Sequence, residues 1–83
     1  MKFSIAWSSE AMRVLVGLER AIAQRVVQKL EEAAQEPTHF FQRLEGRPEW
    51  KLRVGDYRII AHVDFRQNRI FVATLGHRKN IYK

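Results

Sequence analysis

Cysteine is missing from this chain of 83 residues, and so is any long apolar run. The lack of cysteine excludes a disulfide scaffold, a cysteine-ligated zinc site and a cysteine nucleophile. No stretch approaches the roughly 18 consecutive apolar residues that indicate a transmembrane helix. The first residues also lack the apolar core of a secretory signal peptide, because only a short apolar run surrounds Ile5. We therefore expect a cytoplasmic protein.

Several motifs of catalysis and metal binding are also missing. The four glycines are isolated, so they form no phosphate-cradling loop. Ser8 and Ser9 lack the flanking glycines of a nucleophile elbow and are typical of a helix cap. The three histidines, His39, His62 and His77, are too far apart for a zinc pattern. We therefore expect neither a metal nor a cofactor, and no carboxylate pair is poised for acid–base catalysis.

The chain does have an excess of positive charge, and this excess lies in one half. Residues 1–42 are balanced, whereas residues 43–83 carry ten lysines and arginines against four acidic residues, so the net charge is +6. Such asymmetry favours a polyanionic partner, either nucleic acid or an acidic protein segment, over a surface that is merely soluble. The length admits one domain, residues 1–83. On folding, a domain this small buries only about 60% of the surface that its unfolded chain exposes, so a partner could matter for its stability.

The first half predicts one strand and two helices. Residues 2–7 alternate, which favours a short strand with Phe3, Ile5 and Trp7 on one side. The serines after Trp7 then cap a first helix. A second helix is predicted up to Pro37, because the residue before a proline disfavours the helical conformation. Its apolar stripe consists of Ile22, Val26, Leu30 and Ala33.

The second half predicts a loop and three strands. Residues 37–49 are expected to be a loop from which Phe40, Phe41 and Leu44 reach back to the core. Period-two patterns then predict strands over residues 50–54, 57–64 and 69–75, the last closed by Gly76 and followed by a basic tail. Short turns make neighbouring strands antiparallel. The predicted class is α+β, in the order β-α-α-β-β-β, with a helical hairpin packed on one face of a twisted, mainly antiparallel sheet.

The turn Gly55-Asp56 sets the register of the first hairpin. A two-residue loop places Arg53 opposite Arg58, and alternation then puts Lys51 on the same face. Like charges directly opposite one another destabilise a sheet by a few tenths to about 1 kcal/mol. A bound anion reverses this effect, so the pattern favours an anion site over three cations that splay apart in solvent. A register slip of one residue would exclude this interpretation.

The sequence resembles a known family, the RelE branch of the RelE/ParE toxin superfamily. The resemblance covers nearly the whole chain. It rests on the order and spacing of four motifs, Leu44-Glu45-Gly46, Trp50-Lys51-Leu52-Arg53, Gly55-Asp56-Tyr57-Arg58, and Gly76-His77-Arg78 with Ile81-Tyr82.

The resemblance implies a toxin of a type II toxin–antitoxin system with a RelE-like fold. Such a toxin is a ribosome-dependent mRNA endonuclease: it enters the ribosomal A site, and the 2′-hydroxyl of the mRNA attacks the adjacent phosphate. Its implied partners are the ribosome, the mRNA and a cognate antitoxin with an acidic or amphipathic segment. It needs no cofactor or metal.

The resemblance also implies the site residues. Lys51, Arg53, Arg58, Arg78 and Tyr82 match the catalytic set, with Tyr82 stacking on a base and the arginines holding the phosphate. We expect RNA contacts from Lys51, Arg53, His77 and Lys79. Of the three strand cations only Lys51 can accept a proton, because a guanidinium stays charged. Arg53 stands where RelE toxins often have lysine, so no general base is expected there.

Two alternatives remain open at this stage. A ParE-like toxin shares the fold but inhibits DNA gyrase and cuts no RNA. Loss of the basic and aromatic set would indicate it, and that set is present here. A relative that binds nucleic acid without turnover is the other alternative.

Overall fold

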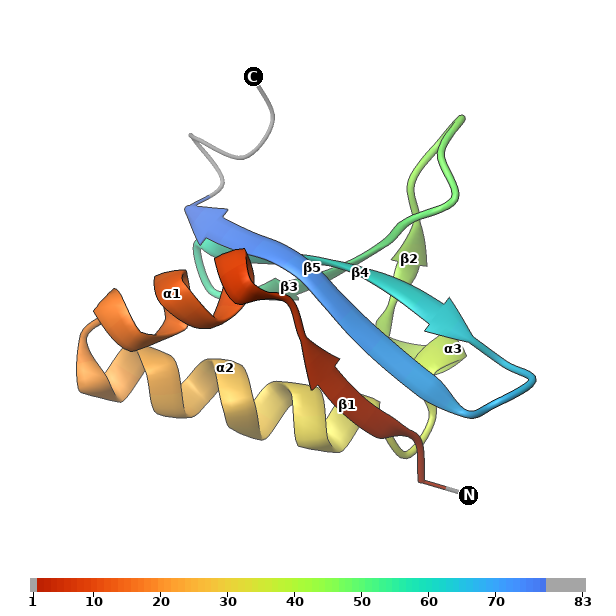
Figure 1. The fold of residues 1–83 in the computed structure, drawn as a ribbon, viewed down its shortest axis with the longest axis horizontal. Coiled ribbons are helices and arrows are strands. Elements are labelled where there is room, and N and C mark those ends of the chain that lie inside the picture. Colours follow the sequence, from red (N-terminus) through yellow and green to blue (C-terminus); the bar gives the residue numbers. More distant parts are fainter. Residues whose placement is uncertain (1, 78–83) are drawn as a thin grey trace.

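The computed structural model describes residues 2–77 as three helices and five strands (Figure 1). In chain order these are β1 (Ser4–Trp7), α1 (Ser9–Gly17), α2 (Arg20–Ala33), α3 (Pro37–Phe40), β2 (Gln42–Arg43), β3 (Trp50–Val54), β4 (Tyr57–Asp64) and β5 (Arg69–His77). The predicted α+β class is confirmed. Among these residues no helix is long and apolar enough to cross a membrane.

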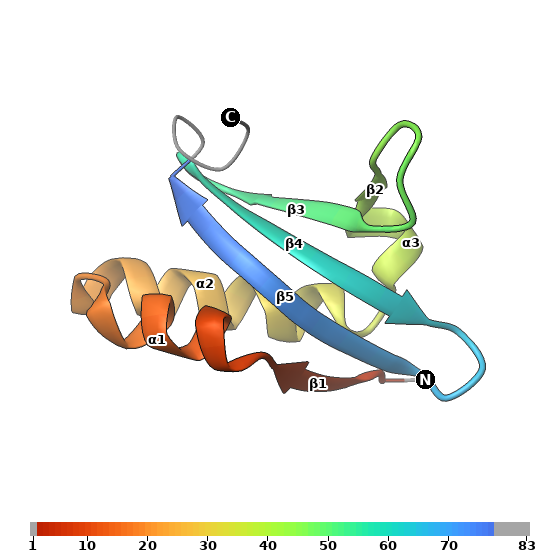
Figure 2. The ribbon, with the colours of Figure 1, turned by 45° about the horizontal axis from the view of Figure 1, so that its top comes forward.

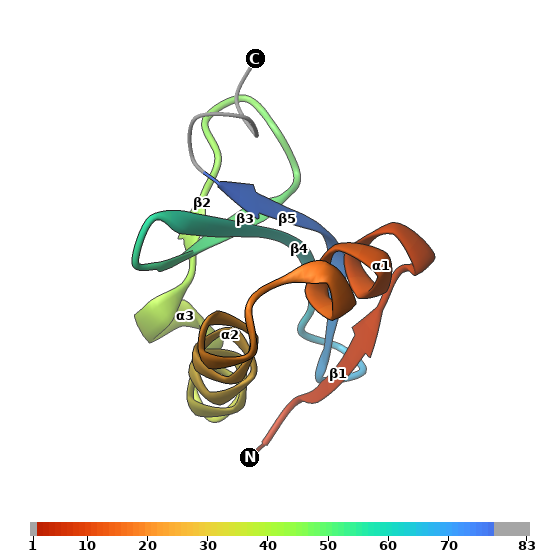
Figure 3. The ribbon, with the colours of Figure 1, turned by 90° about the vertical axis from the view of Figure 1, so that its left-hand side faces the viewer.

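The five strands form one mixed sheet in the order β1-β5-β4-β3-β2 (Figure 2). The pairs β2–β3, β3–β4 and β4–β5 are antiparallel, whereas β1 is parallel to β5. A parallel neighbour requires a long connection. The helical hairpin of α1 and α2 follows β1, and both helices lie on the same side of the sheet (Figure 3). Within residues 2–77, no helix lies on the opposite face of β3, β4 and β5.

Ser8 joins the first helix to β5. Its hydroxyl accepts a hydrogen bond from the Ala11 amide at 3.0 Å, which is the predicted N-cap. The same hydroxyl donates to the Ala73 carbonyl at 2.6 Å. Ala73 is the extra residue of a bulge, because Ile60 pairs with Thr74 while Ala61 pairs with Val72. Ser8 therefore satisfies a carbonyl that the bulge removes from the ladder.

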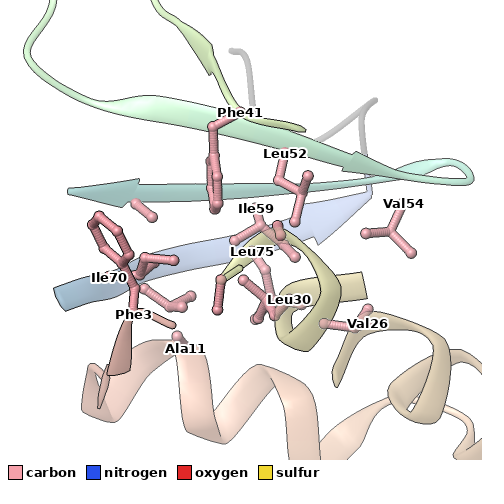
Figure 4. Close-up of a cluster of buried hydrophobic side chains, with 14 residues drawn as sticks. Phe3, Ala11, Val26, Leu30, Phe41, Leu52, Val54, Ile59, Ile70 and Leu75 are labelled. Atoms are coloured by element: carbon pink, nitrogen blue, oxygen red, sulfur yellow. The ribbon is translucent and has the colours of Figure 1, made fainter. Parts of the chain in front are cut away.

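The core lies between the sheet and the helices (Figure 4). From α2 the predicted stripe supplies Val26, Leu30 and Ala33, all fully buried. From the sheet, Leu52 and Ile59 project toward them. The buried apolar residues are Phe3, Ala11, Val26, Leu30, Ala33, Ala34, Phe41, Leu52, Val54, Ile59, Ala61, Ile70, Val72 and Leu75.

Two local predictions are wrong. Residues 37–49 are not all loop: Pro37 opens the single turn α3, where its fixed φ suits the first helical position, and β2 follows. Phe41 between them is buried as expected. The last strand does not close at Gly76, because Gly76 pairs with Arg58 and His77 pairs with Tyr57.

Candidate functional site

The β3–β4 hairpin carries the candidate site, and its register is the predicted one. Val54 pairs with Tyr57 and Arg53 with Arg58 across the Gly55-Asp56 turn. Gly55 has φ +58° at the first central position, where a type II′ turn places glycine. This turn fixes which residues face which across the two strands.

Three cations therefore share the face that no helix covers. Leu52 and Val54 point into the core, so Lys51 and Arg53, which alternate with them, point the other way. Arg58 lies directly opposite Arg53 and joins the same face. Arg53 is exposed, while Lys51 and Arg58 are half-buried. We call Lys51, Arg53 and Arg58 the cationic set.

A hollow of about 310 Å³ contains all three members of the cationic set. It extends around the edge of β3 toward α2 and α3. The residues that line it are Lys29, His39, Phe40, Gln42, Lys51, Leu52, Arg53 and Arg58. Sequence reasoning missed Lys29, His39 and Gln42 as site residues, because they come from elements that only the tertiary fold brings to this edge.

Lys29 is held in place from two sides. Its ammonium lies 5.0 Å from the centroid of the Phe40 ring and 3.6 Å from a carboxylate oxygen of Glu32. Both members of the ion pair are substantially exposed, so the pair contributes little to stability. Lys29 therefore remains available to an anion that enters the hollow.

The chemistry of this hollow is anion binding. Two guanidinium groups offer forked donors that match phosphate oxygens, and one amine lies beside them. No group of three or more histidine, aspartate or glutamate residues that could hold a metal occurs within residues 2–77. The donors that the cationic set offers suit a phosphate.

Of the remaining predicted site residues, only His77 lies within the described part of the chain. His77 pairs with Tyr57, their ring centroids 5.5 Å apart, and so lies on the sheet face opposite Arg58. The structure does not bring His77 together with the cationic set. Its predicted RNA contact therefore has no support from the geometry. Arg78, Lys79 and Tyr82 lie outside the described residues.

His62 does lie on the uncovered face, beyond the cationic set along β4. It is exposed and pairs with Phe71, and the two ring centroids are 6.5 Å apart. Phe71 is itself 40% exposed. This pair does not line the hollow of the cationic set.

The comparisons with known proteins agree with this fold. Residues 5–82 match the family described as ParE toxin of the type II toxin–antitoxin system parDE. The match spans nearly the whole chain, so the protein is a member of the RelE/ParE class of toxins. More particularly, it belongs to this ParE toxin family. Among curated proteins, no sequence matches this chain.

Three solved structures illustrate the similarity of fold. The RelBE2 toxin–antitoxin complex from Mycobacterium tuberculosis matches with a TM-score of 0.83 at 22% identity, over 94% of this chain and 100% of that chain. The archaeal RelE–RelB complex from Pyrococcus horikoshii gives 0.81 at 24% identity, over 96% and 99%. A double mutant of the E. coli toxin RelE in the free state gives 0.78 at 22% identity, over 98% and 88%. At these identities the similarity establishes a RelE-like fold.

Proposed function

We propose that this toxin is a ribosome-dependent mRNA endonuclease that cuts mRNA in the A site and so inhibits translation. The observation that carries the proposal is the pairing of Arg53 with Arg58 beside Lys51 on an uncovered sheet face. A scissile phosphate seated there offsets the repulsion between the two arginines. The toxin would act in the cytoplasm, where mRNA is translated.

The proposed reaction is a transesterification within the RNA. The 2′-oxygen of one nucleotide bonds to its 3′-phosphorus while the bond from that phosphorus to the 5′-oxygen of the next nucleotide breaks. The products are a 2′,3′-cyclic phosphate and a free 5′-hydroxyl. The 2′-hydroxyl gives up a proton and the leaving 5′-oxygen takes one from solvent.

The members of the cationic set have different roles in this reaction, because a guanidinium and an amine differ in their chemistry. Arg53 and Arg58 hold the phosphate and stabilise the negative charge that grows on its oxygens. Lys51 is the member of the set assigned to the proton of the 2′-hydroxyl, because neither guanidinium can accept one. Arg78 and Tyr82 stay part of the proposed site through the family resemblance, with Arg78 on the phosphate and Tyr82 stacked on a base.

A cognate antitoxin is part of the same proposal. Several of the similar solved structures are complexes of a RelE toxin with a RelB antitoxin. The net charge of +6 suits an antitoxin with an acidic segment. We expect co-expression of such a partner to suppress toxicity.

Inhibition of DNA gyrase is the second candidate function. It is favoured by the description of the matching family, which names a ParE toxin. In that case the cationic set would serve binding alone, and no RNA would be cut.

The deciding experiment is primer extension on a reporter mRNA in a translation extract with purified toxin, with and without ribosomes. Discrete cuts inside codons that need ribosomes support the endonuclease. Intact mRNA together with inhibition of purified gyrase in a supercoiling assay supports the second candidate instead. An active RelE toxin serves as the positive control for cleavage.

A further inference from the structure

A second hollow continues the first around the edge of the sheet. It has a volume of about 280 Å³ and lies between α2 and the end of β3. Lys29 and Arg53 line both hollows, so the two adjoin. The residues that line the second hollow are Arg25, Gln28, Lys29, Glu32, Arg53, Val54 and Gly55.

The path between the two hollows is open because β2 is so short. β2 pairs only with Trp50 and Lys51 of β3. From Leu52 to Val54 the strand pairs with β4 on one side, and no strand of the described part of the chain pairs with its other edge. An extended ligand can therefore pass from the uncovered face over this edge to α2.

Positively charged side chains continue along this path onto α2. Arg25 and Lys29 are four residues apart on α2 and so lie on one face, about 6 Å apart along the axis. The Arg25 guanidinium packs against the turn, where a Cβ on Gly55 would lie 3.4 Å from its Nη2. Within residues 2–77 no carboxylate forms an ion pair with Arg25.

One carboxylate opposes these charges. Glu32 lines the second hollow and pairs with Lys29 at 3.6 Å. The Glu32 side chain is 60% exposed, so the pair is screened and easily exchanged for another anion. Together the two hollows present five cations and this single acid.

We propose that Arg25 and Lys29 form a second phosphate subsite, which holds the backbone of the single-stranded RNA beside the phosphate that is cut. The inference rests on the proposed function and names the part of its substrate that is bound away from the reaction. Arg25 and Lys29 are positioning residues: they anchor the strand and do not touch the reacting atoms. Because they contact phosphates alone, the subsite is indifferent to base sequence.

The test measures binding of single-stranded 2′-O-methyl RNA without ribosomes, by fluorescence anisotropy over a series of salt concentrations. This RNA lacks the attacking hydroxyl, so binding is read apart from cleavage. The double variant Arg25→Gln/Lys29→Gln should weaken binding of a decanucleotide. It should also reduce the slope of log K against log salt by about 1.4, since each phosphate contact on a single strand contributes about 0.7.

Three further measurements sharpen this result. The variant Arg13→Gln/Arg20→Gln removes the same charge from exposed helix positions outside both hollows, and it should leave the slope unchanged. A trinucleotide, too short to occupy both hollows, should bind the single variant Arg25→Gln as well as it binds the parent, because Arg25 lines only the second hollow. Glu32→Gln should tighten binding of the decanucleotide, a gain that misfolding cannot produce.

Three results would overturn the subsite. One is an equal loss in the two double variants. Another is no measurable binding by the parent at 50 mM salt. The third is preferential binding of double-stranded DNA with the same dependence on Arg25 and Lys29. Failure of the proposed function is a separate result, since it is read from intact mRNA in the ribosome assay.

Discussion

Arg53 and Arg58 lie directly opposite each other on adjacent antiparallel strands, two like charges at one pair position. Side chains in such a pair have Cβ atoms about 4.5–5.5 Å apart. The pair adds nothing to the core, because its side chains lie on the face that no helix covers. An anion that binds between the two guanidinium groups would offset the cost of this pair to the folded state.

Neutralising one member of this pair should stabilise the free protein. Arg53→Gln should raise the free energy of unfolding by about 0.2–1 kcal/mol and should abolish cleavage. Urea unfolding with a constant m-value measures the first effect, and the ribosome assay measures the second. Arg66 is an exposed arginine in the β4–β5 turn. Arg66→Gln is therefore the control, and it should change neither the free energy of unfolding nor the rate of cleavage. A less stable Arg53→Gln protein would contradict the repulsion.

Substitution of Lys51 separates charge from proton transfer. Lys51→Arg keeps the positive charge but removes the group that can accept a proton, so the single-turnover cleavage rate should fall at least about 100-fold. RNA binding, measured with uncleavable RNA, should stay near that of the parent. Lys51→Ala should weaken RNA binding and also abolish cleavage, because it removes both the charge and the proton acceptor. Cleavage by Lys51→Arg at the parent rate would show that only the charge of this residue is needed.

Ser8 should contribute more to the free energy of unfolding than an ordinary helix cap does. Ser8→Ala removes the hydrogen bond to the Ala11 amide and leaves the Ala73 carbonyl without its 2.6 Å partner. We expect a loss of about 1–2 kcal/mol, which in a domain of this size lowers Tm by roughly 4–16 °C. Ser9→Ala, one position later and exposed, is the matched control and should lower Tm far less. Equal losses in the two variants would refute the double role of Ser8.

Two glycines should respond to alanine with opposite signs. Gly55→Ala forces a side chain into φ +58° and crowds the Arg25 guanidinium, so it should cost about 1–2 kcal/mol. Gly17→Ala, in α1 with nothing within 4 Å of its Cβ position, should gain about 0.5–1 kcal/mol. Chemical denaturation measures both. Stabilisation by Gly55→Ala would show that the turn does not need glycine.

Much of the site was predictable because a two-residue turn leaves no freedom of register. Once Gly55-Asp56 is recognised, the pairing of Arg53 with Arg58 follows from chain geometry alone. The apolar stripe of α2 was predictable for a similar reason, since helical periodicity assigns Val26 and Leu30 to one face. Both patterns depend on residues close in sequence.

The elements α3 and β2 were not predictable, because neither is stable by itself. A single helical turn at Pro37 and a strand of two residues form only when packing and pairing with other segments support them. The position of His77 was missed because the strand was expected to end earlier. Alternation from the buried Leu75 then places His77 on the helix side.

By itself the sequence determined the class of fold, the hairpin register and the face shared by Lys51, Arg53 and Arg58. Each of these follows from local periodicity and turn chemistry. Only the tertiary structure decided that Lys29 and Arg25 of α2 adjoin this face. Their proximity depends on how far β2 covers the edge of β3 and on how α2 packs beneath the sheet. The packing of α2 brings Lys29 and Arg53 together although they are 24 residues apart in the sequence, and no local pattern reports such a contact.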